Sequence, residues 1–209
     1  MNVHTRRFRV DGPVGAIEAL RDEPDASVAP RGTAVIAHPH PLFGGTMDNK
    51  VVQTLARAFV QSGWVALRFN FRGVGGTEGD HDEGRGELED MLAVVATQAP
   101  QGPIALAGFS FGSFVASGAV ARLWPTRPAE KIVLIGTAAQ RFDVAVLPPE
   151  SHDRTLVVHG EHDDTVPLQS VLDWARPQTL PVTVVPGGSH FFHGQLPLLK
   201  SLVLRHLRS

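Results

Sequence analysis

Short apolar runs alternate with amphipathic stretches along most of this sequence. The apolar runs cover residues 33–37, 64–69, 104–107, 132–135, 155–158 and 182–185. Runs of this length suit parallel strands that are buried on both faces. The amphipathic stretches cover residues 49–61, 87–97, 111–123, 168–175 and 196–207. Such stretches are typical of helices packed on a sheet, so the alternation predicts an α/β fold with a mostly parallel central sheet and helices on both faces.

A predicted hairpin precedes this pattern, because residues 8–10 and 15–20 flank the turn Asp11-Gly12-Pro13-Val14. Together with the six apolar runs it predicts a sheet of about eight strands. A chain of 209 residues with 43% hydrophobic content can bury one good core. The sequence contains no obvious linker, repeat or low-complexity tract, so we expect residues 1–209 to form a single domain.

Two absent residue types limit the chemistry of any active site. The chain has no cysteine, which excludes thiol nucleophiles and thiolate metal sites, and it has no tyrosine that could serve as an acid. The net charge of -2 provides no basic field, so we expect no nucleic-acid partner. The first residues include no apolar signal region, and no apolar run approaches the roughly 18 residues of a membrane helix. We therefore expect a soluble, cytoplasmic protein without a membrane partner.

A serine between two glycines follows the apolar run at residues 104–107. Gly108-Phe109-Ser110-Phe111-Gly112 matches the pattern G-x-S-x-G, a sharp turn that holds a serine in a strained conformation between a strand and a helix. Glycines are needed there because side chains would collide with the neighbouring strand and helix. The turn exposes the Ser110 hydroxyl and leaves the Phe111 amide, at a helix N-terminus, free to stabilise negative charge. Without further context, the pentapeptide alone is equally consistent with an ordinary tight turn.

Two later loops supply the other groups that an acyl-transfer serine requires. HGEHDDTVP (159–167) follows one predicted strand, and PGGSHFF (186–192) follows the next. A base must accept the serine proton, and an acid must hold the tautomer of that base. The order serine, aspartate, histidine is the one expected for the α/β-hydrolase topology.

Five segments together resemble the α/β-hydrolase superfamily, in particular its small, lidless serine hydrolases and esterases. They are HPHPLFGG (38–45), FRGVGGTEG (71–79), GFSFGS (108–113), HGEHDDTVP (159–167) and GGSHFF (187–192). The resemblance covers nearly all of the chain after the first hairpin. It implies an α/β-hydrolase fold without a lid domain, with Ser110 as the nucleophile, Asp163 as the acid and His190 as the base.

Neighbouring residues compete for two of these roles. Asp163 and Asp164 are adjacent, and the family spacing after His159-Gly160 favours Asp163, leaving Asp164 as a loop or helix-start residue. His162 lies beside the acid and comes too early in the chain to be the base. His193 is expected to begin the last helix, which leaves His190.

The second oxyanion donor is expected in the loop HPHPLFGG, because this superfamily places it after the third strand. Prolines have no N–H, so His38, His40 or Leu42 must donate near the strand end. We favour the backbone amide of His40, which follows the position of the usual His-Gly pair. Pro39 replaces the glycine of that pair, so the sequence leaves the path of this loop open.

Other chemistries have weaker support. His38-x-His40 lacks the further ligands of a metallo-hydrolase, and His159-x-Glu161 lacks the cysteines of a zinc deaminase. The glycine-rich stretch 73–76 does not match a nucleotide-binding motif. We therefore expect no metal and no cofactor.

The predicted reaction is hydrolysis of small carboxylic esters through an acyl-enzyme. Thioesterase or peptidase activity with the same triad, or a non-catalytic interaction module on this fold, are the alternatives. Six phenylalanines lie near the predicted site in the sequence, each as a candidate for an acyl pocket or for the core: Phe43, Phe109, Phe111, Phe142, Phe191 and Phe192. A homodimer is the default assembly for a protein of this kind.

Overall fold

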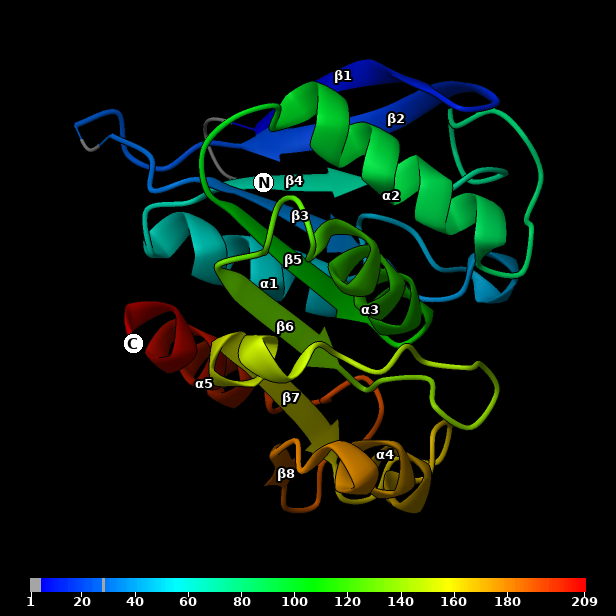
Figure 1. Ribbon diagram of the computed structural model, residues 1–209, viewed down its shortest axis with the longest axis vertical. Coiled ribbons are helices and arrows are strands. Elements are labelled where there is room, and N and C mark those ends of the chain that lie inside the picture. Colours follow the sequence, from blue (N-terminus) through cyan, green and yellow to red (C-terminus); the bar gives the residue numbers. More distant parts are fainter. Residues whose placement is uncertain (1–4, 28) are drawn as a thin grey trace.

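The computed structural model describes residues 5–27 and 29–209, and its centre is one eight-stranded sheet (Figure 1). The strands are β1 (Thr5–Gly12), β2 (Gly15–Asp22), β3 (Thr33–Ala37), β4 (Val65–Phe69), β5 (Ile104–Phe109), β6 (Lys131–Ile135), β7 (Thr155–Gly160) and β8 (Val182–Val185). Their order in the sheet is β1-β2-β4-β3-β5-β6-β7-β8. β1, β2 and β4 pair antiparallel, and the remaining neighbours are parallel. The predicted fold class is confirmed.

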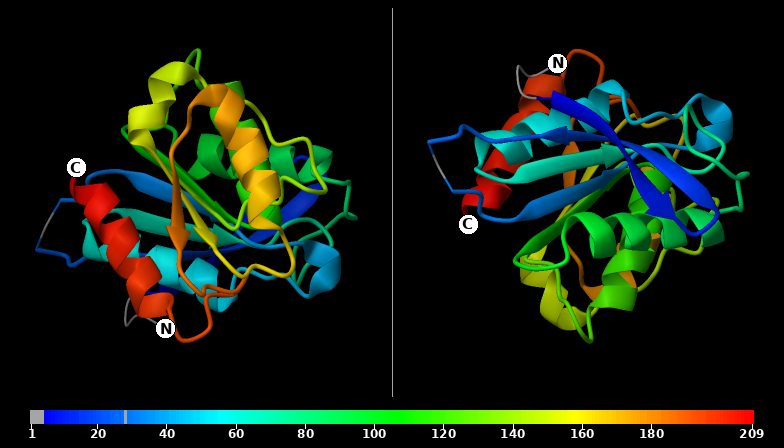
Figure 2. Two further views of the ribbon diagram at one scale, coloured as in Figure 1. Left: turned by 90° about the horizontal axis from the view of Figure 1, so that it is seen from below. Right: turned by 90° about the horizontal axis from the view of Figure 1, so that it is seen from above.

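Helices cover both faces of this sheet (Figure 2). The α-helices are α1 (Lys50–Gln61), α2 (Arg85–Gln98), α3 (Phe111–Leu123), α4 (Leu168–Ala175) and α5 (Leu196–Arg208). α1 and α5 pack on one face, and α2, α3 and α4 pack on the other. Every residue of β5 is buried, as expected for a central strand that lies between two helical layers.

Several element boundaries differ from the sequence-based prediction. β1 is longer than residues 8–10, because it pairs with β2 along its whole length, from Thr5 opposite Asp22 to Gly12 opposite Gly15. Helix α1 begins one residue later than predicted. Asn49 is its N-cap, and its side-chain oxygen accepts a hydrogen bond from the Val51 amide.

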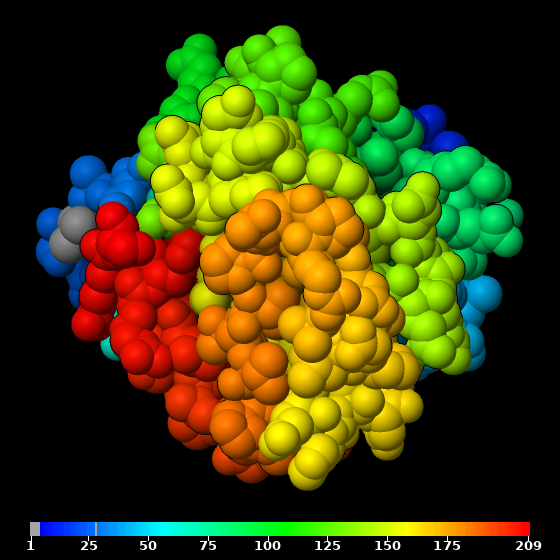
Figure 3. Space-filling view, turned by 60° about the horizontal axis from the view of Figure 1, so that its bottom comes forward, coloured from blue at the N-terminus to red at the C-terminus, as the bar shows by residue number. Residues whose placement is uncertain are grey.

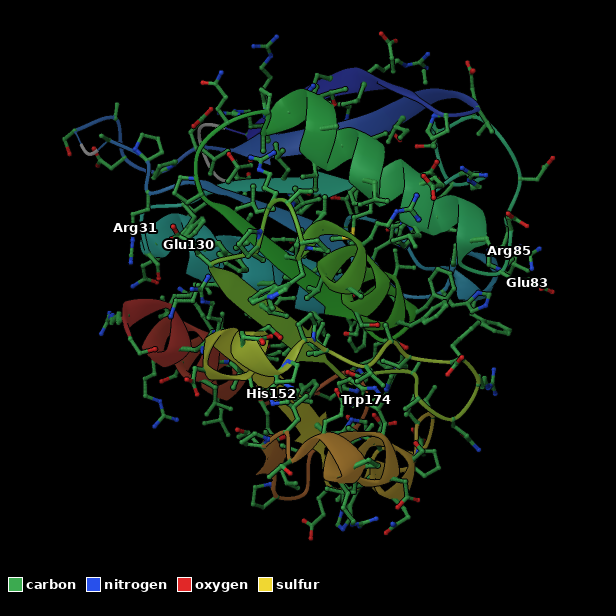
Figure 4. All side chains as sticks on the ribbon, viewed as in Figure 1. Arg31, Glu83, Arg85, Glu130, His152 and Trp174 are labelled. Atoms are coloured by element: carbon green, nitrogen blue, oxygen red, sulfur yellow. The ribbon has the colours of Figure 1, made fainter. Side chains whose placement is uncertain are left out.

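The segment between β6 and β7 contains a short 3-10 helix, η2 (Pro149–Arg154), and no helical lid in the described chain. Figure 3 shows a face of the molecule on which the red α5, the yellow segment around η2 and the orange segment that follows α4 meet. The loop before η2 is tied to α4, because the Trp174 indole Nε1–H donates to the Ala145 carbonyl at 3.2 Å (Figure 4). None of the described helices is both long enough and apolar enough to cross a membrane.

The opening hairpin is hydrogen-bonded to the loops at the carboxyl edge of the sheet. Glu18 of β2 accepts hydrogen bonds from the Asn70 side-chain amide at 2.8 Å and from the Gly76 amide at 2.9 Å. The other side-chain atom of Asn70, Oδ1, accepts the Met47 N–H at 2.9 Å. One amide group therefore joins the hairpin to the segment that precedes α1.

Candidate active site

The candidate residues come from loops that follow neighbouring parallel strands. Ser110 directly follows β5, Asp163 follows β7, and His190 follows β8. The carboxyl ends of parallel strands point to the same edge of the sheet, on the right-hand side in Figure 1. Residues 80 positions apart in the chain therefore meet at this edge.

Ser110 has a backbone conformation that few residues adopt, with φ 58° and ψ -117°. Its amide donates to the Ile135 carbonyl of β6 at 2.8 Å, which holds the turn against the sheet. A Cβ at Gly108 would lie 2.1 Å from the Gly112 oxygen, and a Cβ at Gly112 would lie 2.4 Å from the Ala37 oxygen. Both glycines are therefore required by close backbone approach, as the sequence analysis expected.

A continuous hydrogen-bonded chain joins the three side chains. His190 Nδ1 lies 2.7 Å from Asp163 Oδ2, and His190 Nε2 lies 3.0 Å from Ser110 Oγ. All three residues are buried, with 2% of His190 and 8% of Ser110 exposed to solvent. In this arrangement Nδ1–H donates to the carboxylate, and Nε2 is free to accept the serine proton.

The structure distinguishes the two adjacent aspartates by their contacts. Asp163 Oδ1 accepts the Thr165 amide at 3.0 Å and the Val166 amide at 2.7 Å. Burial raises the pKa of Asp163, but the hydrogen bonds from His190 and the Val166 amide outweigh it, and the net pKa lies below its usual value. Asp164 is exposed, and its carboxylate accepts only the Thr165 hydroxyl, at 3.4 Å. Asp163 is thus an oriented anion at neutral pH.

The His190 ring is held between a glycine and two aromatic rings. A Cβ at Gly136, where φ is +55°, would lie 3.3 Å from His190 Cε1. The Phe109 ring centre lies 4.9 Å from the imidazole on one side, and the Phe191 ring lies edge-on at 5.0 Å. His193 lies in the turn before α5, so the expectation that it begins that helix is wrong.

A second histidine, His159 of β7, lies behind Asp163 and was not among the predicted site residues. Its side chain is fully buried, and Nε2 lies 2.8 Å from the Val166 carbonyl and 3.3 Å from Asp163 Oδ2. Its Nδ1 has no hydrogen-bond partner among the residues that the structure describes. Burial lowers the pKa of His159, so the ring is neutral and Nε2 carries the proton. A polar residue near the end of a buried strand is the sequence signal that could have identified it.

The loop between β3 and α1 places one of the three candidate oxyanion donors at the site. The Leu42 amide donates to His40 Nδ1 at 3.2 Å, and His38 is fully buried. His38 Nε2 accepts the Phe71 amide at 3.0 Å, and His38 Nδ1 lies 2.6 Å from the Pro39 carbonyl. Of the three, His40 lines the cavity above Ser110. No hydrogen bond engages the His40 or Phe111 amide within the described part of the chain.

Comparison with solved structures identifies the superfamily to which this fold belongs. A lidless α/β serine hydrolase from Xanthomonas campestris superposes with a TM-score of 0.87 at 36% identity, over 100% of this chain and 95% of that one. An α/β serine hydrolase homologue from Coxiella burnetii superposes with a TM-score of 0.81 at 37% identity, over 97% of each chain. The chain belongs to the α/β-hydrolase superfamily.

A relative of this α/β-hydrolase is an uncharacterized protein of Rickettsia prowazekii. The two are 31% identical over 193 residues, which is 87% of this chain and 80% of the relative. No protein-family model matches the chain.

A cavity of about 390 Å³ opens beside Ser110 in this α/β-hydrolase. Four of the six candidate phenylalanines line it, namely Phe43, Phe111, Phe142 and Phe191. Phe109 and Phe192 are fully buried and belong to the core on the α1–α5 face. Phe43 is 73% exposed and Phe191 is 44% exposed, so the cavity has an apolar mouth that is open to solvent.

Proposed function

We propose that this α/β-hydrolase is a serine esterase that cleaves small carboxylic esters through an acyl-enzyme. The hydrogen-bonded chain from Asp163 through His190 to Ser110 carries the proposal. Its distances are those at which a histidine can accept a serine proton while a carboxylate holds the ring.

In the first step, His190 Nε2 removes the proton from Ser110 as Oγ attacks the ester carbonyl. The imidazolium that forms is stabilised by Asp163, whose carboxylate is anionic because its pKa is lowered. The carbonyl oxygen becomes an oxyanion, which we assign to the amides of Phe111 and His40. His190 then protonates the leaving alkoxide, and the acyl group remains on Ser110.

In the second step, water replaces the alcohol. His190 accepts a proton from this water, the resulting hydroxide attacks the acyl carbonyl, and the same two amides stabilise the second oxyanion. The proton returns to Ser110 Oγ as the carboxylic acid leaves. The open mouth of the cavity and the absence of a helical lid in the described chain suit substrates that enter directly from solvent.

Labelling with a fluorophosphonate tests the proposal. The wild-type protein is expected to form a covalent adduct on Ser110 and to hydrolyse 4-nitrophenyl butyrate. Ser110→Ala should abolish labelling and lower kcat by about ten-thousandfold or more. Ser201→Ala, on the exposed surface of α5, is the matched control and should behave like wild type.

A panel with matched ester, thioester and amide bonds separates the esterase from its alternatives. A higher kcat/KM for the thioester or the amide would replace the ester assignment while keeping the same residues. Absence of both labelling and turnover would leave a non-catalytic interaction module.

A further inference from the structure

The permanent charge among the described residues that line the cavity is positive only. Arg141 is the one permanently charged residue among the described residues that line the cavity, and no aspartate or glutamate accompanies it there. Within the described chain, the Arg141 guanidinium has no ion pair with a carboxylate. Its contact is instead with an aromatic face, because its central carbon lies 5.8 Å from the centre of the Phe43 ring. A cation at the mouth of an apolar cavity is therefore available to a ligand.

The loop that carries Arg141 is fixed by contacts of the residues that follow it. Phe142, the next residue, stacks on Phe114 of α3 with ring centres 4.8 Å apart and meets the Phe111 ring edge-on at 5.2 Å. Further along the loop, Ala145 is held by the Trp174 indole, which donates to the Ala145 carbonyl. The Ala145 amide donates to the Ser117 hydroxyl at 3.2 Å. These contacts place the Arg141 backbone beside the cavity without a lid movement.

Ring contacts define the route from Ser110 to Arg141. The Phe111 ring, next to Ser110 in the chain, lies 4.9 Å from the His40 ring, and the His40 ring lies 4.7 Å from the Phe43 ring. Arg141 lies over Phe43. The rings of Phe111, His40 and Phe43 therefore lie between the reacting carbon and a ligand group bound at Arg141. A substrate that reaches both needs a linker of several methylene groups, which these apolar rings can contact.

The same contacts assign Arg141 to one side of the ester. The leaving alcohol must lie next to His190 Nε2, which protonates it, and Phe191 flanks that histidine. Arg141 instead lies over Phe43, whose ring contacts His40, the residue whose amide we assign to the oxyanion of the acyl carbonyl. We therefore direct the acyl chain of the substrate toward Phe43 and Arg141.

We propose that the preferred acyl group ends in a carboxylate, which Arg141 binds beyond an apolar spacer, so that half-esters of dicarboxylic acids are the substrate class. This inference rests on the esterase function proposed above. A carboxylate fits because a guanidinium presents paired N–H donors to its two oxygens.

Two esters with the same leaving group test this inference. The probes are 4-nitrophenyl hydrogen suberate, which is anionic, and its methyl ester, which is neutral. For the wild-type protein the ratio of kcat/KM, anionic over neutral, should be about three to five at low ionic strength, the size expected for an ion pair open to solvent. Added salt should lower the ratio, because it screens the charges.

Variants of Arg141 supply the decisive comparison. The ratio should fall to about one in Arg141→Gln and below one in Arg141→Glu. Arg205→Gln is the control, since Arg205 is also exposed but lies on α5, away from the cavity. A wild-type ratio of one or less, or a ratio that Arg141→Gln leaves unchanged, overturns the inference.

Two further outcomes separate this inference from the function on which it rests. If the protein labels with a fluorophosphonate and hydrolyses the neutral ester without charge preference, the esterase assignment stands and the acyl inference fails. If it neither labels nor hydrolyses either ester, both fail. A preference seen only for 3-carboxyphenyl acetate over its methyl ester would place the anion on the alcohol and overturn the acyl assignment.

Discussion

Replacing His38 with glutamine should make the folded protein less sensitive to acid between about pH 6.5 and pH 4. The Phe71 amide donates to His38 Nε2 at 3.0 Å, and His38 Nδ1 donates to the Pro39 carbonyl. Protonation of Nε2 would place its N–H directly opposite the Phe71 N–H inside the core, so that neither donor would have an acceptor. Burial, reinforced by the charge of His40 and opposed by the Pro39 hydrogen bond, lowers the pKa of His38 from 6.5 to about 4.

The sign and size of the effect follow from this lowered pKa. In the unfolded chain His38 takes up a proton as the pH falls through its ordinary pKa of about 6.5. In the folded protein it stays neutral down to a pKa of about 4. The stability contributed by the neutral form is therefore complete above pH 6.5 and is lost progressively as the pH falls to about 4. The total is on the order of 3 kcal/mol, with a slope approaching 1.4 kcal/mol per pH unit.

Urea unfolding at pH 7, 6 and 5 measures this slope. Glutamine suits the position because its amide oxygen can accept the Phe71 N–H, so His38→Gln should fold and should lose less stability per pH unit than wild type. His206→Gln is the positive control, and it should reduce the pH slope to a similar extent, because burial also lowers the pKa of His206 to about 4. Equal pH slopes for wild type and His38→Gln would refute the reasoning.

Three further substitutions and one control, Asp164→Asn, test the proposed catalytic groups and the residues that support them. Gly136→Ala should lower kcat by roughly tenfold or more, because the added Cβ would press on the His190 ring and the backbone φ is +55°. An unchanged kcat, measured by steady-state kinetics on the folded variant, would contradict this expectation. His159→Gln should lower kcat more than it raises KM and shift the acid limb of the pH profile, because His159 lies 3.3 Å from Asp163 Oδ2. An unaltered pH profile would contradict a role for His159 in positioning Asp163. Asp163→Asn should cost about ten-thousandfold in kcat, while Asp164→Asn should stay close to wild type.

Much of the fold could be predicted from the sequence, because buried parallel strands leave an unbroken apolar run. β5 is recognised in this way, and the glycines on either side of Ser110 mark the turn that follows it. The order of the acid and histidine loops indicated where these groups lie, and the resemblance to the α/β-hydrolase superfamily nominated Asp163 and His190, which the structure brings together with Ser110. Their catalytic roles remain predictions.

Other features depend on tertiary contacts that a sequence does not display. Phe109 and Phe111 are neighbours on either side of Ser110, yet the first is core on the α1–α5 face and the second lines the cavity, because the turn sends them to opposite sides of the sheet. His159 contacts Asp163 only because the loop after β7 folds back over it. The full length of β1 depends on pairing with β2, not on its own apolar content.

The carboxylate of Glu18 links the first two strands to loops outside the hairpin. Through Asn70 and Gly76 it connects them to backbone that borders the catalytic edge, including Met47 ahead of α1. Shortening the chain from its amino end would therefore leave a side-chain amide and a main-chain N–H without an acceptor, far from the cut. The hairpin therefore supports loops that lie dozens of positions away in the chain. Removing it would change the conformation of those loops as well as the edge of the sheet.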